Sequence, residues 1–301
     1  MGIQLSILQF FQGMRSPILN IIFLIFTIST ELPVIVAFTA YMYWCLNKKT
    51  GQKILFSLIG NITLNTGIKE FVKAPRPIGI EGLESLRVST ATGYSFPSGH
   101  TQTATSFWIS LMLIFKKTWI VILGIVMFLG VGVSRLYLAV HWPIDVICGW
   151  IFGIIFTLLL CKIFDYVSET KKYWFLVLIL VPFIVGIFIV DSQEYTKIFG
   201  LLTGYVLGYI VEDKYIKFKT EYQIKGKINF SKNNRNNSYS RDKIKRDISR
   251  FLIGIITLGG LYIGLKYIMP DEVIFNYIRY TVVVFYAIAG VPTIFKLLKL
   301  N

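Results

Sequence analysis

The amino-acid sequence predicts an all-α protein, a polytopic bundle of transmembrane helices. Two observations predict this fold class. Of the 301 residues, 54% are hydrophobic and 16% are charged, whereas soluble domains have about 25% charged residues. The apolar residues also gather in runs, and a helix needs about 20 mostly apolar residues to cross a bilayer.

Ten apolar runs are candidates for the spanning helices. In chain order they are Pro17–Thr30, Leu32–Leu46, Lys53–Ile68, Ser98–Phe115, Trp119–Leu138, Ile144–Phe164, Tyr173–Val190, Ile198–Val211, Phe251–Ile268 and Val273–Leu298. The first two runs are short and share a break at Glu31–Pro33, where we expect two spans rather than one interrupted helix. The stretch before them is mixed in character, and we expect no cleavable signal peptide.

Loop charges give the bundle an orientation. With a cytoplasmic N-terminus, the basic side chains of the short connections fall on the cytoplasmic side: Lys48, Lys49, Lys53, Lys116, Lys117, Lys162, Lys171 and Lys172. The acidic side chains fall on the opposite side: Glu31, Asp191, Glu194, Asp271 and Glu272. This is the positive-inside pattern. It predicts a cytoplasmic C-terminus and brings the loops Lys69–Pro97 and Ser134–Pro143 together on the extracytoplasmic face.

The positive charge of the chain indicates a membrane partner. The formal net charge is +15 and the pI is about 9.6. In a membrane protein, excess Lys and Arg marks cytoplasmic loops near anionic lipid, so we expect a lipid bilayer and no nucleic acid as partner. Residues 213–250, rich in Asn, Ser and Lys, cannot bury a core and are expected to form a mobile cytoplasmic linker. Nothing in the sequence indicates the oligomeric state.

Three short polar stretches interrupt the apolar background on the extracytoplasmic side. The first closes the third span, where Asn61, Asn65 and Lys69 recur every four residues and form one polar face that should point into the bundle. Lys69 alone is typical of a residue that reaches the membrane interface. Arg76, in a loop stiffened by two prolines, suits planar hydrogen bonding to phosphate oxygens.

The second stretch, Phe96–His100, opens the fourth span. Ser98 suits a helix N-cap, and Gly99 lets the backbone come close to a ligand. The unpaired N–H groups of the next turn form an anion site with His100 at its mouth. Capping and packing also explain Ser98 and Gly99 without any ligand.

The third stretch holds Arg135, His141 and Asp145 between the fifth and sixth spans. Ionisable residues at membrane depth indicate a functional site. A carboxylate four residues after His141 can accept a hydrogen bond from Nδ1, which leaves the Nε2 lone pair to act as a nucleophile or base. Asp145 equally suits the first turn of a helix, where the helix dipole stabilises it.

In this order and spacing, the three stretches resemble the signature motifs of the type 2 phosphatidic acid phosphatase family. The superfamily includes vanadium haloperoxidases, bacterial acid phosphatases and glucose-6-phosphatase. The matching positions are Lys69-x6-Arg76-Pro77, Pro97-Ser98-Gly99-His100 and Ser134-Arg135-x5-His141-x3-Asp145. The resemblance implies a six-helix phosphatase core, which we expect in residues 1–170. Two further spans in 171–212, the linker 213–250 and two C-terminal spans in 251–301 complete the expected organisation.

The resemblance also implies roles. His141 would take the phosphoryl group, Asp145 would orient it and His100 would protonate the leaving oxygen. Five further signature positions would hold the phosphate oxygens: Lys69, Arg76, Ser98, Gly99 and Arg135. No acidic cluster offers a site for a hard metal ion, so we expect neither a metal nor another cofactor. The expected substrate is a membrane lipid phosphate or diphosphate, with undecaprenyl diphosphate preferred and phosphatidate-type lipids as alternatives.

Other functions use the same residues. A phosphotransferase would pass the phosphoryl group from His141 to another hydroxyl instead of to water, and the sequence does not separate the two. A non-enzymatic transporter or receptor of lipid phosphates is disfavoured, because binding alone needs no second imidazole at the anion site. A haloperoxidase is disfavoured because that activity belongs to soluble members of the superfamily.

Overall fold

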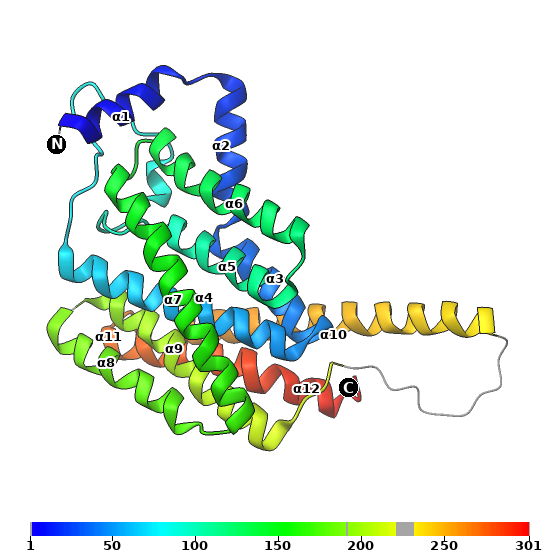
Figure 1. The fold of residues 1–301 in the computed structure, drawn as a ribbon. Helices are drawn as coiled ribbons and strands as arrows, with labels where there is room; N and C mark the ends of the chain where they lie inside the picture. The colour runs from blue at the N-terminus through cyan, green and yellow to red at the C-terminus, as the bar shows by residue number, and fades with distance from the viewer. Residues whose placement is uncertain (1, 191, 221–231, 301) are drawn as a thin grey trace. The chain divides into compact units, whose positions relative to one another are not determined.

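The computed structural model describes residues 2–190, 192–220 and 232–300, which contain helices and no β-strand (Figure 1). The α-helices are α1 Gly2–Gly13, α2 Pro17–Ser29, α3 Leu32–Tyr41, α4 Lys48–Val72, α5 Gly99–Phe115, α6 Thr118–Tyr137, α7 Pro143–Thr170, α8 Trp174–Val190, α9 Gln193–Val211, α10 Lys232–Ile268, α11 Val273–Phe285 and α12 Val291–Leu297. Single π-helical turns follow α3, α9 and α11, and a 3-10 turn, Val88–Thr90, lies between α4 and α5.

Every predicted apolar run is helical. The first two runs are separate helices, α2 and α3, and the last run is interrupted by the π-helical turn Tyr286–Gly290. Among the described residues, four helices are long and apolar enough to cross a membrane: Thr118–Tyr137, Pro143–Thr170, Asp242–Ile268 and Val273–Leu297. The protein is therefore a multi-pass membrane protein, and the number of ten crossings remains a prediction.

The chain forms two compact units whose boundaries differ from the predicted division. Unit 1 comprises Met1–Val36 and Lys53–Phe199, and unit 2 comprises Ala37–Gln52 and Gly200–Asn301. The helix α8 and the start of α9 belong to unit 1, where Tyr195 of α9 lies against a glycine of α4 and a glycine of α8. A Cβ at Gly67 would lie 3.0 Å from its ring, and one at Gly186 would lie 2.3 Å from its hydroxyl.

The prediction that residues 213–250 bury no core is wrong for the end of this segment, which lies in unit 2. Residues 232–250 belong to α10, and Arg250 is fully buried. Its guanidinium donates to the backbone oxygens of Trp44 (3.2 Å) and Leu300 (2.7 Å) and lies 4.9 Å from the ring centre of Phe218. An arginine whose donors are satisfied in this way can pack inside a protein. Residues 221–231 of the predicted linker lie outside the described residues.

The helices of unit 1 bring the predicted loops together at one end. The helix α5 packs against α6 and α7. Gly149 and Gly153 of α7 permit this close approach, since a Cβ at Gly153 would lie 2.7 Å from the Cβ of Thr105. The beginnings of α5 and α7 therefore lie side by side, and the ends of α4 and α6 reach the same end of the unit.

The N-terminal helix α1 also packs at this end. Leu8 is fully buried in a cluster with Leu83, Leu136, Ala139 and Val146, which belong to the loops and helix ends around the site. This contact of α1 was not predicted from the sequence. Its uncharged sequence contains no signal that would have revealed the contact.

Candidate active site

The polar face of α4 points into unit 1, as predicted. Asn61 is fully buried and Asn65 is 5% exposed. The amide of Asn65 donates to the backbone oxygen of Pro97 (3.3 Å), within the second signature stretch. One helical turn later, Lys69 Nζ donates to the backbone oxygens of Tyr94 (2.5 Å) and Ser95 (3.3 Å). The end of α4 thus holds the loop that leads into α5.

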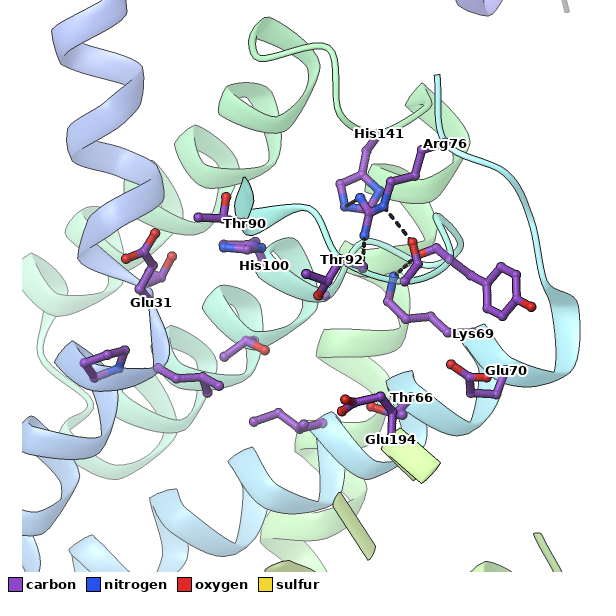
Figure 2. A pocket seen from close by; sticks show the side chains of 18 residues that line it. Glu31, Thr66, Lys69, Glu70, Arg76, Thr90, Thr92, His100, His141 and Glu194 are labelled. Atoms are coloured by element: carbon purple, nitrogen blue, oxygen red, sulfur yellow. Dashed lines mark hydrogen bonds between the residues drawn. The ribbon is translucent and has the colours of Figure 1, made fainter. Parts of the chain in front are cut away.

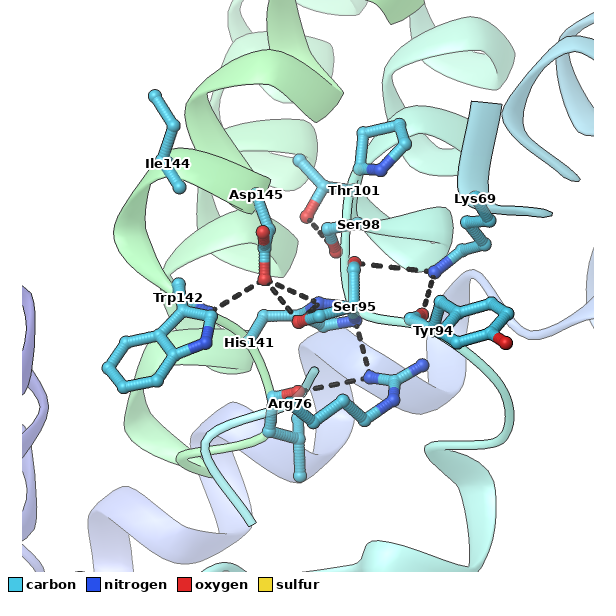
Figure 3. A network of polar contacts seen from close by, with 12 residues as sticks. Lys69, Arg76, Tyr94, Ser95, Ser98, Thr101, His141, Trp142, Ile144 and Asp145 are labelled. Atoms are coloured by element: carbon cyan, nitrogen blue, oxygen red, sulfur yellow. Dashed lines mark hydrogen bonds and ion pairs between the residues drawn. The ribbon is translucent and has the colours of Figure 1, made fainter. Parts of the chain in front are cut away.

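Arg76 lies directly against His141 (Figure 3). Its Nη1 is 3.0 Å from His141 Nε2 and 3.0 Å from the backbone oxygen of Val140, and its other nitrogens donate to the backbone oxygens of Thr92 and Gly93. Because a guanidinium only donates hydrogen bonds, Nε2 of His141 is the acceptor in this contact. The proton of the neutral imidazole is therefore on Nδ1.

The Nδ1 side of His141 faces Asp145. Nδ1 lies 3.3 Å from Asp145 Oδ2, as the spacing of four residues predicts, and 3.3 Å from Ser95 Oγ. The same carboxylate oxygen accepts hydrogen bonds from the Ser95 hydroxyl and from the backbone N–H of Trp142 (2.8 Å). Asp145 therefore caps α7 and orients the imidazole at once, so both interpretations of its position apply.

The second signature stretch lies at the start of α5. Ser98 occupies the N-cap position, but its hydroxyl caps no backbone N–H and instead accepts a hydrogen bond from Thr101 (2.8 Å). The Ser98 N–H donates to the backbone oxygen of Asp145 (2.9 Å), which joins this stretch to the third one. A Cβ at Gly99 would lie 3.3 Å from Asn65 Oδ1. His100 follows in the first turn and is partly exposed.

Arg135 is fully buried near the end of α6. Its Nη1 donates to the hydroxyl of Thr27 on α2 (3.2 Å), and that hydroxyl also pairs with Ser134 (2.9 Å). Nε and Nη2 of Arg135 have no hydrogen-bond partner in the part of the chain that the structure describes. Buried guanidinium donors without partners are costly, and a bound anion would satisfy them.

A cavity of about 560 Å³ opens in front of these residues (Figure 2). Five of the predicted site residues line it: Lys69, Arg76, Gly99, His100 and His141. The other three, Ser98, Arg135 and Asp145, are buried and absent from its lining. The cavity extends to the break between α2 and α3 at Thr30–Pro33, and three carboxylates also line it: Glu31, Glu70 and Glu194.

The surroundings of His141 favour its neutral form. Burial, followed by the positive charges of Lys69, Arg76 and Arg135, holds the pKa of His141 well below its ordinary value of 6.5. Burial also lowers the pKa of the Arg76 guanidinium, although Asp145 opposes this effect. The imidazole therefore keeps its Nε2 lone pair at neutral pH.

Two functional contacts escaped the sequence-based prediction. Ser95 contacts both His141 and Asp145, and Thr27 holds Arg135. Ser95 comes directly before the second stretch, so its closeness to that stretch was the only available signal. Thr27 lies in an apolar run more than one hundred residues before its partner and carried no signal.

Two family models match this chain. The first describes the PAP2 superfamily and matches residues 51–169, which include every predicted site residue. The chain belongs to the PAP2 superfamily. The second describes the transmembrane extension of PAP2 superfamily phosphatases and matches residues 196–301. Most of that match falls in unit 2, which also contains Ala37–Gln52 from the N-terminal part of the chain.

Several named phosphatases resemble this PAP2 chain. It is 36% identical to the undecaprenyl-diphosphatase of Sulfolobus acidocaldarius over 106 residues, which are 35% of this chain and 51% of that protein. Identity to mouse sphingosine-1-phosphate phosphatase 1 is 26%, over 56% of this chain and 41% of that protein. Identity to phosphatidylglycerophosphatase B of Bacillus subtilis is 30%, over 47% of this chain and 70% of that protein.

The match to a solved structure is also partial. The crystal structure of Aquifex aeolicus LpxE superimposes with a TM-score of 0.48 and 24% identity, over 53% of this chain and 95% of that chain. The chain spans about half the length, or less, of the first relatives that it matches, with 51% and 41% of their residues covered.

Proposed function

We propose that the protein is a membrane phosphatase that removes phosphate from a lipid phosphate or diphosphate through a phosphohistidine at His141. The observation that carries the proposal is that each imidazole nitrogen of His141 has a different partner. Nε2 accepts from Arg76 at the cavity wall, while Nδ1 faces the carboxylate of Asp145. When the substrate phosphate takes over the hydrogen bond of Arg76, the Nε2 lone pair becomes free to attack a phosphorus atom held by the same arginine.

The surrounding charges suit phosphoryl transfer. This reaction depends on positioning and on stabilising negative charge spread over three oxygens. Lys69 and Arg76 at the cavity wall, the backbone at Gly99 and the buried Arg135 supply those donors. In the first step Nε2 of His141 bonds to phosphorus while the P–O bond to the leaving group breaks, and His100 donates a proton to the leaving oxygen. In the second step His100 takes a proton from the water that attacks phosphorus, the P–Nε2 bond breaks, and His141 and inorganic phosphate are released.

Undecaprenyl diphosphate is the proposed preferred substrate, with the site on the extracytoplasmic face and the C-terminus in the cytoplasm. The name of the Sulfolobus acidocaldarius relative supports this choice of substrate. The pattern of loop charges supports the orientation. Among the described residues, no three His, Cys, Asp or Glu side chains gather closely enough to hold a metal ion, and we propose that the reaction needs none.

Phosphate release from a panel of lipids tests this function. The full chain, purified in detergent, should release phosphate from undecaprenyl diphosphate with a higher kcat/KM than from phosphatidate, phosphatidylglycerophosphate or sphingosine 1-phosphate. EDTA should leave the rate unchanged. Loss of activity with EDTA would disprove the metal-free reaction, and a different ranking would disprove the substrate. Added glycerol that captures labelled phosphate in place of water would indicate a phosphotransferase.

The rate should also hold at mildly acidic pH. Because the pKa of His141 is lowered, its neutral form persists as the pH falls through 6.5. The acidic limb of kcat/KM should therefore lie below pH 6.5. Among the positive charges near His141, that of Lys69 lowers its pKa most. Lys69→Met removes this charge, so the acidic limb of kcat/KM should move toward pH 6.5 in that variant. A limb at or above pH 6.5 in the wild type would contradict the prediction.

A further inference from the structure

The first two helices carry a feature that the phosphatase chemistry does not use. Both expose large apolar side chains, whose exposed fractions are 81% for Ile3, 65% for Phe10, 71% for Ile18, 60% for Ile21 and 61% for Ile25. The helix α1 contains no charged residue. An uncharged helix with such a surface is poorly suited to water.

Hydrogen bonds attach α1 to the end of unit 1 that carries the site. Gln4 accepts from the backbone N–H of Ile144 (3.2 Å), three residues after His141. Gln12 accepts from the backbone N–H of Glu84 (2.8 Å), in the loop between α4 and α5. Together with the buried Leu8, these contacts place the whole of α1 beside the site loops.

Residues at both ends of α2 contact the site end of the unit, although Phe26 packs deeper, against Gly130 of α6. Near its start, Tyr137 donates to Asn20 (2.5 Å), and Arg15 donates to the backbone oxygen of Tyr137 (3.1 Å). Near its end, Thr27 contacts Arg135, and Glu31 pairs with Arg87 (2.5 Å) and lines the cavity.

We propose that α1 and α2 form an arm embedded in the leaflet on the active-site side, with the acyl chains of that leaflet covering the exposed isoleucines and Phe10. The chain bends by 118° between the two helices, which allows α1 to lie along the membrane surface while α2 enters and does not cross. The lack of charge on α1 matches a hydrocarbon partner rather than water or an anionic headgroup.

The arm changes the predicted topology at one place. The N-terminus then lies on the same side of the membrane as the site, and α3 becomes the first crossing. Every connection from Lys48 onward keeps its side, so the positive-inside pattern is preserved. The proposed phosphatase chemistry is unaffected.

Single cysteines test the arm in a full chain whose native Cys45, Cys148 and Cys161 are replaced by alanine and that still releases phosphate. Gly13→Cys reports the end of α1, where a Cβ meets no atom within 4 Å. Exposed Glu81→Cys reports the site loop, and exposed Lys117→Cys reports the opposite end of unit 1. With an impermeant maleimide on intact cells, Gly13→Cys should react together with Glu81→Cys, and Lys117→Cys should react only after permeabilisation.

Two outcomes would overturn the arm, and one separates it from the proposed orientation. If Gly13→Cys shows the same accessibility as Lys117→Cys on intact cells, and the opposite accessibility to Glu81→Cys, the arm is disproved. A spin label at Phe10→Cys or Ile21→Cys that is relaxed more by a nickel chelate than by oxygen, as expected at Glu81→Cys, would disprove the contact with lipid. If Gly13→Cys and Glu81→Cys are both protected while Lys117→Cys reacts, the arm stands and the extracytoplasmic site is disproved.

Discussion

Replacing His141 by alanine should lower the turnover of lipid phosphate by at least about 10³-fold. The expected loss is large because His141 would form the bond to phosphorus, and no other described side chain combines a lone pair at the cavity with a carboxylate behind it. Brief incubation with labelled diphosphate and an alkaline quench should leave label on the wild-type protein and none on His141→Ala. Near-normal turnover in the variant would contradict the assignment.

The second histidine provides a matched control. His100→Ala should also slow turnover of lipid phosphate, but much less for an aryl phosphate, because a good leaving group needs no proton. The loss in His141→Ala should be the same for both kinds of substrate, because nucleophilic attack is required in each. If the loss of turnover depends on the leaving group to the same extent in both variants, the division of roles between the two imidazoles is contradicted.

Asp145→Asn should lower kcat by about 10³-fold with little change in KM. The carboxylate is buried and lies outside the cavity wall, so the variant should still bind substrate. An asparagine keeps the oxygen that caps α7 at Trp142, but it does not stabilise a positive charge on His141 as a carboxylate does. Steady-state kinetics on undecaprenyl diphosphate would measure the change, and the thermal midpoint of unfolding should stay close to that of the wild type.

Ser95→Ala is the matched control for Asp145→Asn. It removes the Ser95 hydroxyl that contacts Asp145 and His141 but leaves the carboxylate in place. We therefore expect kcat to fall by only about tenfold, as for the loss of one hydrogen bond to a charged group. If Asp145→Asn costs no more than Ser95→Ala, Asp145 acts as a helix cap alone. A large drop in the unfolding midpoint of Asp145→Asn would point to the same conclusion.

Sequence reasoning predicted the helices and one contact of the candidate site because local rules govern them. Apolar runs predicted the helices, and the spacing of four residues predicted that Asp145 would reach the Nδ1 side of His141. The same rules failed where packing decides. Residues 232–250 are too polar to suggest a buried segment, yet Arg250 is enclosed by backbone oxygens from three distant parts of unit 2.

By itself, the sequence determined the helical fold and the order of the three signature stretches, because hydropathy and motif spacing are local properties of the chain. The count of helices and the loop charges predicted that the three stretches meet at one end of the helices. The tertiary structure alone decided that Arg76 holds Nε2, that Ser95 and Thr27 support the site, and that α1 lies beside it. These contacts join residues that are 46 to 140 positions apart. They depend on how whole helices pack, and neither charge nor periodicity of the segments involved encodes that packing.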